Sequence, residues 1–398
     1  METLTIASLA VQVRGVSYKP EDLHSSLDDS SVILLRANNI DDGRINFDDV
    51  VFVDKKKVSN EQLLRKGDIL VCASSGSKNL VGKAASVDFE REVTFGAFCK
   101  VVRPLNSENA DYLAMYFQSP VYRRNIASAA IGININNIRN EHIDALSVKW
   151  PAADNRSEIV KVLYTTESII RMRKQQLSAL DDLIKARFVE MFGDPEINPL
   201  CWPIKTLDTL LSIEPQNGLY KPQSDYVQDG SGIPILRIDA FYDGKVTSFL
   251  RLKRLQCSEV EKNRYLLKEN DIVINRVNSL EYLGKCAWVT GMAEPTVFES
   301  NMMRFHADES EINPCYLTRL LCSSFVYNQI LNRAKKAVNQ ASINQGDVQS
   351  FRIIVPPISL QKQFAAFVSQ IDKSKSVIQK SLDETQLLFD SLMQKYFG

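Results

Sequence analysis

The chain has 398 residues, of which 48 are lysine or arginine and 48 are aspartate or glutamate, so its formal net charge is zero. This length is enough for at least two domains, and the balanced charge excludes a protein that binds nucleic acid through a large overall basic surplus. Any nucleic-acid surface must therefore come from the local placement of side chains, and its affinity should depend on salt.

The cysteine pattern and the first residues indicate the compartment. The seven cysteines form no C-x-x-C pair, and the first ten residues lack the basic start and long apolar core of a secretory signal. No apolar run approaches the ~18 residues of a membrane span. We therefore expect a cytoplasmic protein with reduced thiols and no association with a membrane.

The sequence of residues 1–151 indicates a first domain of mixed α/β structure in which short strands predominate. Segments rich in Val, Ile and Phe and bounded by Gly, Asn, Asp or Pro are typical of short strands. The predicted strands are 32–36, 68–73, 83–87, 95–102 and 146–150. Residues 111–129 are predicted to form the one substantial helix of this domain.

A phosphate-loop resemblance in this domain fails on inspection. Five residues separate Gly76 from Gly82, where a P-loop has four, and Ala84 occupies the position of the hydroxyl that would bind magnesium. We therefore predict a tight turn into a strand at Gly82 and Lys83, and no NTPase.

Residues 152–194 predict a long helix with a narrow apolar seam. Apolar side chains recur at alternating spacings of mostly four and three residues, as in a coiled coil. The seam of this helix consists of Ile159, Leu163, Ile170, Leu177, Leu180 and Ile184. Asp154 or Asn155 can cap its start, and Gly193 followed by Pro195 should end it.

Residues 195–355 predict a second domain that repeats the first at an offset of about 200 residues. Tyr18-Lys19-Pro20 corresponds to Tyr220-Lys221-Pro222, and Asp68-Ile69 corresponds to Asp271-Ile272. The predicted strands are 234–238, 271–275, 285–289, 302–306 and 351–355, and the predicted helix is 314–334.

Residues 356–398 predict a second long helix with the same spacing. Its seam consists of Phe364, Val368, Ile371, Ile378, Leu382 and Phe389. Adding 205 to the first helix maps Pro151 to Pro356 and Gly193 to Gly398. The fold class predicted is α+β: two similar mixed α/β domains separated by a long antiparallel two-helix coiled coil, with internal duplication and pseudo-two-fold symmetry.

Known catalytic motifs are missing from the sequence. Its three histidines form no H-E-x-x-H, no G-x-S-x-G elbow occurs, and no Asn/Asp-Pro-Pro-aromatic motif of adenine methyltransferases is present. We therefore predict a non-catalytic binding protein with no metal site and no cofactor of its own.

Polar loops that differ between the two repeats are the candidate DNA-binding sites, because Arg, Lys, Asn, Gln and Ser can read base edges in the major groove. The candidates in the first domain are Lys19, Ser74, Ser75, Ser77, Lys78, Asn79, Asn134, Asn136, Asn137 and Arg139. The candidates in the second domain are Lys221, Asn275, Arg276, Asn278, Ser279, Lys335, Lys336, Asn339 and Gln340. A solvated turn explains any one of them equally well, so the hypothesis rests on the whole set. Repeated strands with different loops predict an asymmetric DNA target.

The chain resembles the specificity subunit of bacterial type I restriction-modification systems. The resemblance is carried by the doubled GDILV and NDIVI segments with a Gly-Lys turn downstream, by FVEMFGD at the end of the first long helix, and by IIVPPISLQKQ before the second. It covers essentially the whole chain.

The resemblance implies two target-recognition domains that each read half of a split double-stranded DNA sequence. It also implies that the helix pair sets the length of the unread spacer and docks two modification methyltransferase subunits, which restriction/translocase subunits join. S-adenosylmethionine, ATP and magnesium would belong to those partner subunits. The second helix opens with Pro356-Pro357, and Gln361 replaces Arg156, so the docking of the two methyltransferases should be only pseudo-symmetric.

Three alternatives remain open from the sequence. The chain could serve a methylation-only complex that lacks a nuclease, or it could be a methyltransferase of unusual motif, which would bind S-adenosylmethionine by itself. It could also be a duplicated structural protein without a defined ligand.

Overall fold

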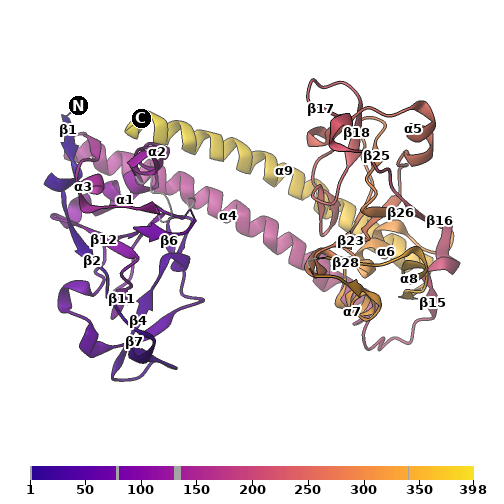
Figure 1. Cartoon of the computed structure of the whole chain (residues 1–398), viewed down its shortest axis with the longest axis horizontal. Coiled ribbons are helices and arrows are strands. Elements are labelled where there is room, and N and C mark those ends of the chain that lie inside the picture. The colour runs from indigo at the N-terminus through magenta and orange to yellow at the C-terminus, as the bar shows by residue number, and fades with distance from the viewer. Residues whose placement is uncertain (1, 78–79, 130–135, 339) are drawn as a thin grey trace. The chain divides into compact units, whose positions relative to one another are not determined.

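The structure is a computed structural model that describes residues 2–77, 80–129, 136–338 and 340–398. It falls into two compact units (Figure 1). Unit 1 comprises Met1–Gln176 and Ile378–Gly398, and unit 2 comprises Leu177–Val377. Each unit therefore contains a globular part and one end of each of two long helices.

The globular part of unit 1 contains two four-stranded sheets, with the orders β10-β8-β12-β2 and β11-β4-β7-β3. The pairs are antiparallel except for β11 with β4. The strands are β1 (Glu2–Thr5), β2 (Ala10–Arg14), β3 (Leu23–His24), β4 (Ser31–Leu35), β5 (Ile40–Asp41), β6 (Arg44–Ile45), β7 (Val51–Asp54), β8 (Ile69–Cys72), β9 (Ser74–Ser75), β10 (Ala84–Ser86), β11 (Val93–Phe95), β12 (Cys99–Pro104), β13 (Asn136–Asn137) and β14 (Ser147–Trp150). The helices are α1 (Ala110–Gln118), α2 (Pro120–Ala129) and α3 (Asn140–Asp144).

The globular part of unit 2 is built around a six-stranded sheet with the order β16-β26-β22-β24-β20-β19, beside the smaller sheet β17-β21-β18-β25. The strands are β15 (Ile204–Thr206), β16 (Leu211–Asn217), β17 (Tyr226–Val227), β18 (Ile233–Leu236), β19 (Phe241–Tyr242), β20 (Gly244–Val246), β21 (Lys253–Leu255), β22 (Asp271–Asn275), β23 (Val277–Asn278), β24 (Cys286–Trp288), β25 (Val297–Phe298), β26 (Met302–Ala307), β27 (Lys335–Lys336), β28 (Ala341–Ser342) and β29 (Arg352–Ile354). The helices are α5 (Glu259–Tyr265), α6 (Pro314–Leu321), α7 (Ser324–Arg333) and α8 (Gln345–Gln349).

Three predicted elements are each divided in two. The helix predicted at 111–129 is interrupted at Ser119, because proline disfavours a helical residue before it and starts α2 at Pro120. The helix predicted at 314–334 is interrupted between α6 and α7, where Ser323 has extended backbone angles at the N-cap position of α7. The strand predicted at 95–102 is two strands, β11 and β12, joined by a turn at residues 96–98.

The two long helices are α4 (Ala153–Phe192) and α9 (Ile358–Phe397), each of 40 residues. At 1.5 Å per residue each is about 60 Å long. The helix α4 ends as predicted, because Gly193 takes a φ of +78°. Its start differs from the prediction: α4 begins at Ala153, so Asp154 lies inside the first turn and does not cap the helix.

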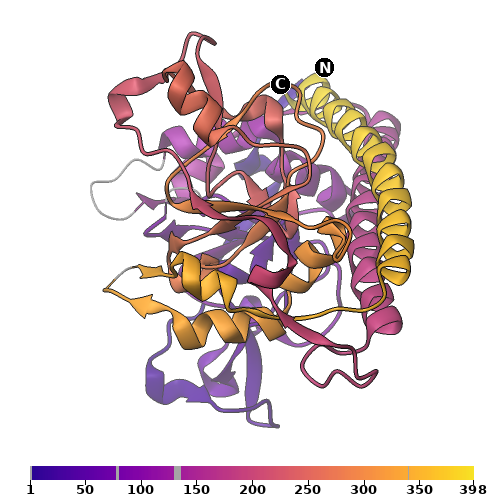
Figure 2. The same cartoon turned by 90° about the vertical axis from the view of Figure 1, so that its right-hand side faces the viewer.

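The long helices pack against each other antiparallel within each unit, and they run side by side in Figures 1 and 2. In unit 1, Ile159 and Leu163 of α4 share one apolar cluster with Met393 and Phe397 of α9. In unit 2, residues near the end of α4 pack with residues near the start of α9: Ile184, Phe188, Phe192, Phe364 and Val368. All the predicted seam residues are buried or half-buried.

Equivalent aromatic contacts join the helix pair to the globular part of each unit. In unit 1 the ring centroids of Phe397 and Tyr112 are 5.2 Å apart, and in unit 2 those of Phe192 and Tyr316 are 4.7 Å apart. Burial raises the pKa of Tyr112 to about 12. The duplication therefore extends to the packing of each helix end.

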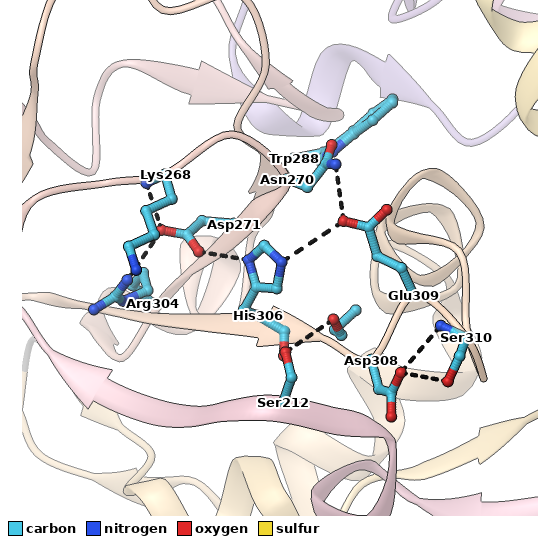
Figure 3. Close-up of polar contacts among 11 residues, drawn as sticks. Ser212, Lys268, Asn270, Asp271, Trp288, Arg304, His306, Asp308, Glu309 and Ser310 are labelled. Atoms are coloured by element: carbon cyan, nitrogen blue, oxygen red, sulfur yellow. Dashed lines mark hydrogen bonds and ion pairs between the residues drawn. The ribbon is translucent and has the colours of Figure 1, made fainter.

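The aspartate of the repeated strand motif is a buried structural residue in both units. In unit 1 Asp68 forms a two-pronged ion pair with Arg103, with both N–O distances at 2.8 Å. In unit 2 Asp271 lies 2.9 Å from Nδ1 of His306 and accepts a hydrogen bond of 3.2 Å from Arg304 (Figure 3). Val102 lies opposite Ile69 in unit 1, and Phe305 lies opposite Ile272 in unit 2. Arg103 and His306 are the next residues along these strands, so they occupy equivalent positions.

The Gly-Lys segments form tight turns, as predicted. Gly82 and Gly284 have φ of +77° and +76°, and a Cβ at either would lie within 2.5 Å of Ile126 or Ile330. Glycine is therefore required both by the backbone conformation and by the close approach of α2 in unit 1 and of α7 in unit 2.

Within the described part of the chain, none of the helices combines the length and apolar character that a membrane crossing requires.

Candidate nucleic-acid interface

The two polar clusters of unit 1 that are far apart in sequence lie side by side in the structure. The strand β9 pairs antiparallel with β13, so that Ser75 is opposite Asn136 and Ser74 is opposite Asn137. The backbone N–H of Ile138 extends this pairing by donating to the carbonyl of Ala73 at 2.8 Å. The polar loops after β8 and before α3 therefore form one short two-stranded ribbon.

Unit 2 contains the same ribbon with one more strand. The strand β23 pairs with β28, which places Val277 opposite Ser342 and Asn278 opposite Ala341, and β28 also pairs with β27. Ile343 donates to the carbonyl of Arg276 at 3.0 Å, in the place of the bond from Ile138 to Ala73. We call these two features the polar ladders: β9 with β13 in unit 1, and β23, β28 and β27 in unit 2.

The predicted site residues differ in how accessible they are. The exposed ones are Lys19, Ser77, Asn137, Arg139, Ser279, Lys335, Lys336 and Gln340. The half-buried ones are Ser74, Ser75, Lys221, Arg276 and Asn278. Lys78, Asn79, Asn134 and Asn339 lie outside the described residues, and only the backbone of Asn136 is described.

The prediction that Asn275 contacts DNA is wrong. Its side chain is 1% exposed at the end of β22, an interior strand of the six-stranded sheet, and its amide donates to the carbonyl of Tyr282. A side chain buried to this extent does not reach a base edge.

Two other predicted cations already have partners within unit 2. Lys221 lies 3.0 Å from a carboxylate oxygen of Glu261 and 3.5 Å from one of Asp225. The hydrogen bond to Glu261 is the main cause of the raised pKa of Lys221. Arg276 donates to the carbonyl of Ser300 at 3.0 Å. Arg276 directly precedes β23, so its contact holds it beside the ladder.

The cations at the outer strand of the unit 2 ladder are less constrained. Lys335 and Lys336 are exposed on β27, and neither has an ion pair among the residues described. Lysines of this kind can neutralise phosphates and so contribute affinity without reading sequence.

A pocket of about 600 Å³ lies beside the turn at residues 299–301, and Asn301 in its lining accepts a backbone hydrogen bond from Val277 of the ladder at 3.3 Å. Its lining includes Tyr220, Arg237, Lys253, Glu299 and Asn301. Glu299 lies 3.8 Å from Arg237, and burial raises the pKa of its carboxyl group. The pocket therefore combines an exposed aromatic ring with cations and amides, the groups that stack on bases or bind to their edges.

Sequence reasoning missed Phe98, Asn301, Tyr220 and Ser342 as surface residues of this region. Phe98 lay inside a predicted strand, and Ser342 lay between candidate loops. The signal available was Gly96 inside the predicted strand, since an isolated glycine in a strand pattern indicates a bulge or a close backbone approach.

The comparisons with known proteins identify the class of domain. Residues 199–385 match the type I restriction modification DNA specificity domain. The whole chain is similar to the EcoKI specificity subunit of Escherichia coli (strain K12), with 28% identity over 405 residues that cover 98% of this chain and 86% of that protein. It is also 27% identical over 403 residues to the StySPI specificity subunit of Salmonella potsdam, with the same two coverages. Residues 199–385 therefore carry this domain, and almost the whole chain is similar to specificity subunits of type I restriction-modification systems.

The fold is shared with solved proteins of the same kind. The S subunit of the type I restriction-modification system from M. genitalium has a TM-score of 0.60 at 14% identity, covering 100% of this chain and 96% of that one. A chain from work on complex assembly and conformational transition of the type I R-M system has a TM-score of 0.54 at 15% identity, with coverages of 100% and 97%.

Proposed function

We propose that this chain is the non-catalytic DNA-recognition subunit of a type I restriction-modification complex and that it reads an asymmetric bipartite target. The ladder of unit 1 reads one half of the target, and the ladder of unit 2 reads the other. The recognition domains are residues 1–151 and 195–355, and the spacer helices are residues 152–194 and 356–398.

The observation that carries this proposal is the duplicated ladder. The backbone pairings 74 with 137 and 75 with 136 recur as 277 with 342 and 278 with 341. The side chains at these positions differ: Ser74 and Ser75 in unit 1 are replaced by Val277 and Asn278 in unit 2. One backbone that presents two sets of side chains is suited to reading two different half-sites.

A two-stranded ladder such as that of unit 1 suits the major groove of DNA. That groove admits a two-stranded β-ribbon, and it presents a distinct pattern of donors and acceptors for each base pair. The hydroxyls and amides of the ladders can donate and accept such bonds, while Lys335 and Lys336 contribute contacts to phosphate.

The helices α4 and α9 supply the other half of the proposal. Two packed helices of about 60 Å are stiff enough to fix the number of unread base pairs between half-sites. Their outward faces dock two modification methyltransferase subunits, which restriction/translocase subunits join. The methyl donor, the nucleotide and magnesium belong to those partners.

Matched variants at one ladder position test the proposal. Ser75→Ala and Asn278→Ala are equivalent positions in the two units, so each is the control for the other. Each variant is assembled with its methyltransferase subunits and given DNA libraries randomised in one half-site at a time. We expect Ser75→Ala to relax base preference in one half and Asn278→Ala in the other, by about 5- to 150-fold at the affected base pair. Equal changes in both halves, or none, would refute the assignment.

A further inference from the structure

One loop approaches the ladder in the same way in both units. In unit 1 it is the turn at residues 96–98 between β11 and β12, and in unit 2 it is the turn at 299–301 between β25 and β26. Phe98 and Asn301 are the last residues of these turns. We call them the 96–98 loop and the 299–301 loop.

The backbone of this loop is held by matching hydrogen bonds. Gly96 donates to Leu35 at 2.9 Å and Ala97 donates to Val16 at 2.9 Å. The equivalent bonds of unit 2 are Glu299 to Leu236 at 3.0 Å and Ser300 to Leu219 at 3.0 Å. The two loops therefore share one anchored conformation.

Each loop also has a close backbone approach that only glycine permits. A Cβ at Gly15 would lie 2.2 Å from the carbonyl oxygen of Gly96, and a Cβ at Gly218 would lie 2.2 Å from that of Glu299. Glycine at both positions fixes how each loop meets the strand beside it.

The last residue of each loop is bonded directly to the ladder. The carbonyl of Phe98 accepts hydrogen bonds from Ala73 at 2.9 Å and Ser74 at 3.0 Å. The carbonyl of Asn301 accepts from Arg276 at 2.9 Å and Val277 at 3.3 Å. The side chains at 98 and 301 therefore start from the same point beside their ladders, and they differ completely in chemistry.

The aromatic ring of Phe98 is exposed to solvent. It is 71% exposed, and it belongs to no apolar cluster among the described residues. Asn301 is half-buried at the edge of the 600 Å³ pocket, and among the described residues its side chain makes no hydrogen bond within the chain. Neither side chain contributes to the core, so both are available to a ligand of the ladder.

We propose that position 98 in unit 1 and position 301 in unit 2 determine base preference. Phe98 contacts the C5-methyl group of a thymine in the half-site of unit 1. Asn301 bonds to N6 and N7 of an adenine in the half-site of unit 2. This inference rests on the proposed function and adds to it the residue and the base of each contact.

The chemistry of the major groove supports this assignment. Thymine alone presents a methyl group there, and phenylalanine is among the side chains that contact it, whereas the amide of asparagine matches the donor and acceptor of adenine. A ring beside a two-stranded ribbon gains by covering that methyl group, because the contact removes apolar surface from water.

Deoxyuridine in place of thymine tests the first contact, since it removes only the methyl group. The two half-sites are first mapped with the wild-type complex, and each thymine of the unit 1 half-site, on either strand, is then replaced in turn. We expect one replacement to weaken binding by the wild-type complex about 4-fold. The same replacement should leave binding by the Phe98→Ala complex unchanged. Leu105→Ala, which removes another exposed apolar side chain of unit 1, should keep the sensitivity to uracil.

7-Deazaadenine tests the second contact, because it removes the N7 acceptor. One such replacement in the unit 2 half-site should weaken wild-type binding about 5-fold, and it should not weaken binding by Asn301→Ala. The inference is overturned if no single replacement affects the wild type, if the variants stay as sensitive as the wild type, or if the unit 1 half-site contains no A·T pair. The Ser75→Ala and Asn278→Ala profiles are independent of these results, so failure of the inference is distinguishable from failure of the proposed function.

Discussion

Phe397→Ala tests how the end of a long helix is attached to a globular part. Phe397 is 4% exposed, and its ring centroid lies 5.2 Å from that of Tyr112 and 5.9 Å from that of Tyr116. Truncating a buried phenylalanine removes its transfer free energy and leaves a cavity, at a cost of about 4 kcal/mol. The equilibrium ratio of unfolded to folded unit 1 should then rise roughly 1,000-fold.

Phe192→Ala is the matched variant in unit 2. Phe192 is 0% exposed and lies 4.7 Å from Tyr316 and 5.5 Å from Phe364 between ring centroids. We expect Phe192→Ala to lower the stability of unit 2 by a similar amount and to leave that of unit 1 unchanged.

Hydrogen exchange followed by mass spectrometry separates the two effects. In Phe397→Ala, the amides of β8 and β12 should exchange up to roughly 1,000-fold faster than in the wild type. The amides of β22 and β26 should keep their wild-type exchange rates. In Phe192→Ala the pattern should reverse. Equal acceleration in both units, or in neither, would refute the reasoning that each helix end is attached to its own unit.

Three further predictions concern unit 2. Asp271→Ala leaves Arg304 and His306 without their buried carboxylate (Figure 3). The free energy of unfolding of unit 2 should therefore fall by about 3–5 kcal/mol, measured by urea unfolding followed by the fluorescence of Trp202 and Trp288. A loss below 1 kcal/mol would contradict the structural role of this carboxylate. Burial raises the pKa of Glu299 in the folded chain, so its ionisation opposes folding, and stability should fall as the pH rises from about 4.5, the unfolded pKa, through the folded value. Glu299→Gln should remove this part of the pH dependence in the same assay; an identical pH profile would contradict the assignment. The double variant Lys335→Ala/Lys336→Ala should lower the slope of log affinity for DNA against log salt by about 2, without altering base preference, in binding titrations at several salt concentrations. An unchanged slope would place these lysines away from phosphate.

The sequence predicted the long helices and central strands well, because their physical signals are local and repeated. The seam of α4 follows the period of a coiled coil, and Gly193 ends the helix with a positive φ. The GDILV and NDIVI segments are apolar on both faces, as interior strands of a covered sheet must be, and they form β8 and β22.

The ladders could not be predicted as units, because their signals are too short. Strands of two residues, such as β9 and β13, carry no period, and their pairing depends on how the sheets bring distant loops together. For the same reason sequence reasoning assigned the two polar clusters separately, although the chain places them in one ribbon.

The prediction for Asn275 failed for a related reason. Asn275 is the last residue of the predicted strand 271–275, and its polarity also made it a candidate of the polar loop that follows. The strand prediction is confirmed, because β22 includes Asn275, and the neighbouring strands bury its side chain. Phe98 shows the converse, because its apolar character suggested a strand interior and a turn anchored at Gly96 exposes it.

Sequencing of methylated bases across the genome of cells that express the complex tests the central claim most directly. The wild-type complex should methylate one bipartite motif with two unlike halves and a fixed spacer. Ser75→Ala should change the motif in one half and Asn278→Ala in the other, with the spacer unchanged in both. A motif without two separate halves, or one altered in both halves by a single variant, would contradict the account.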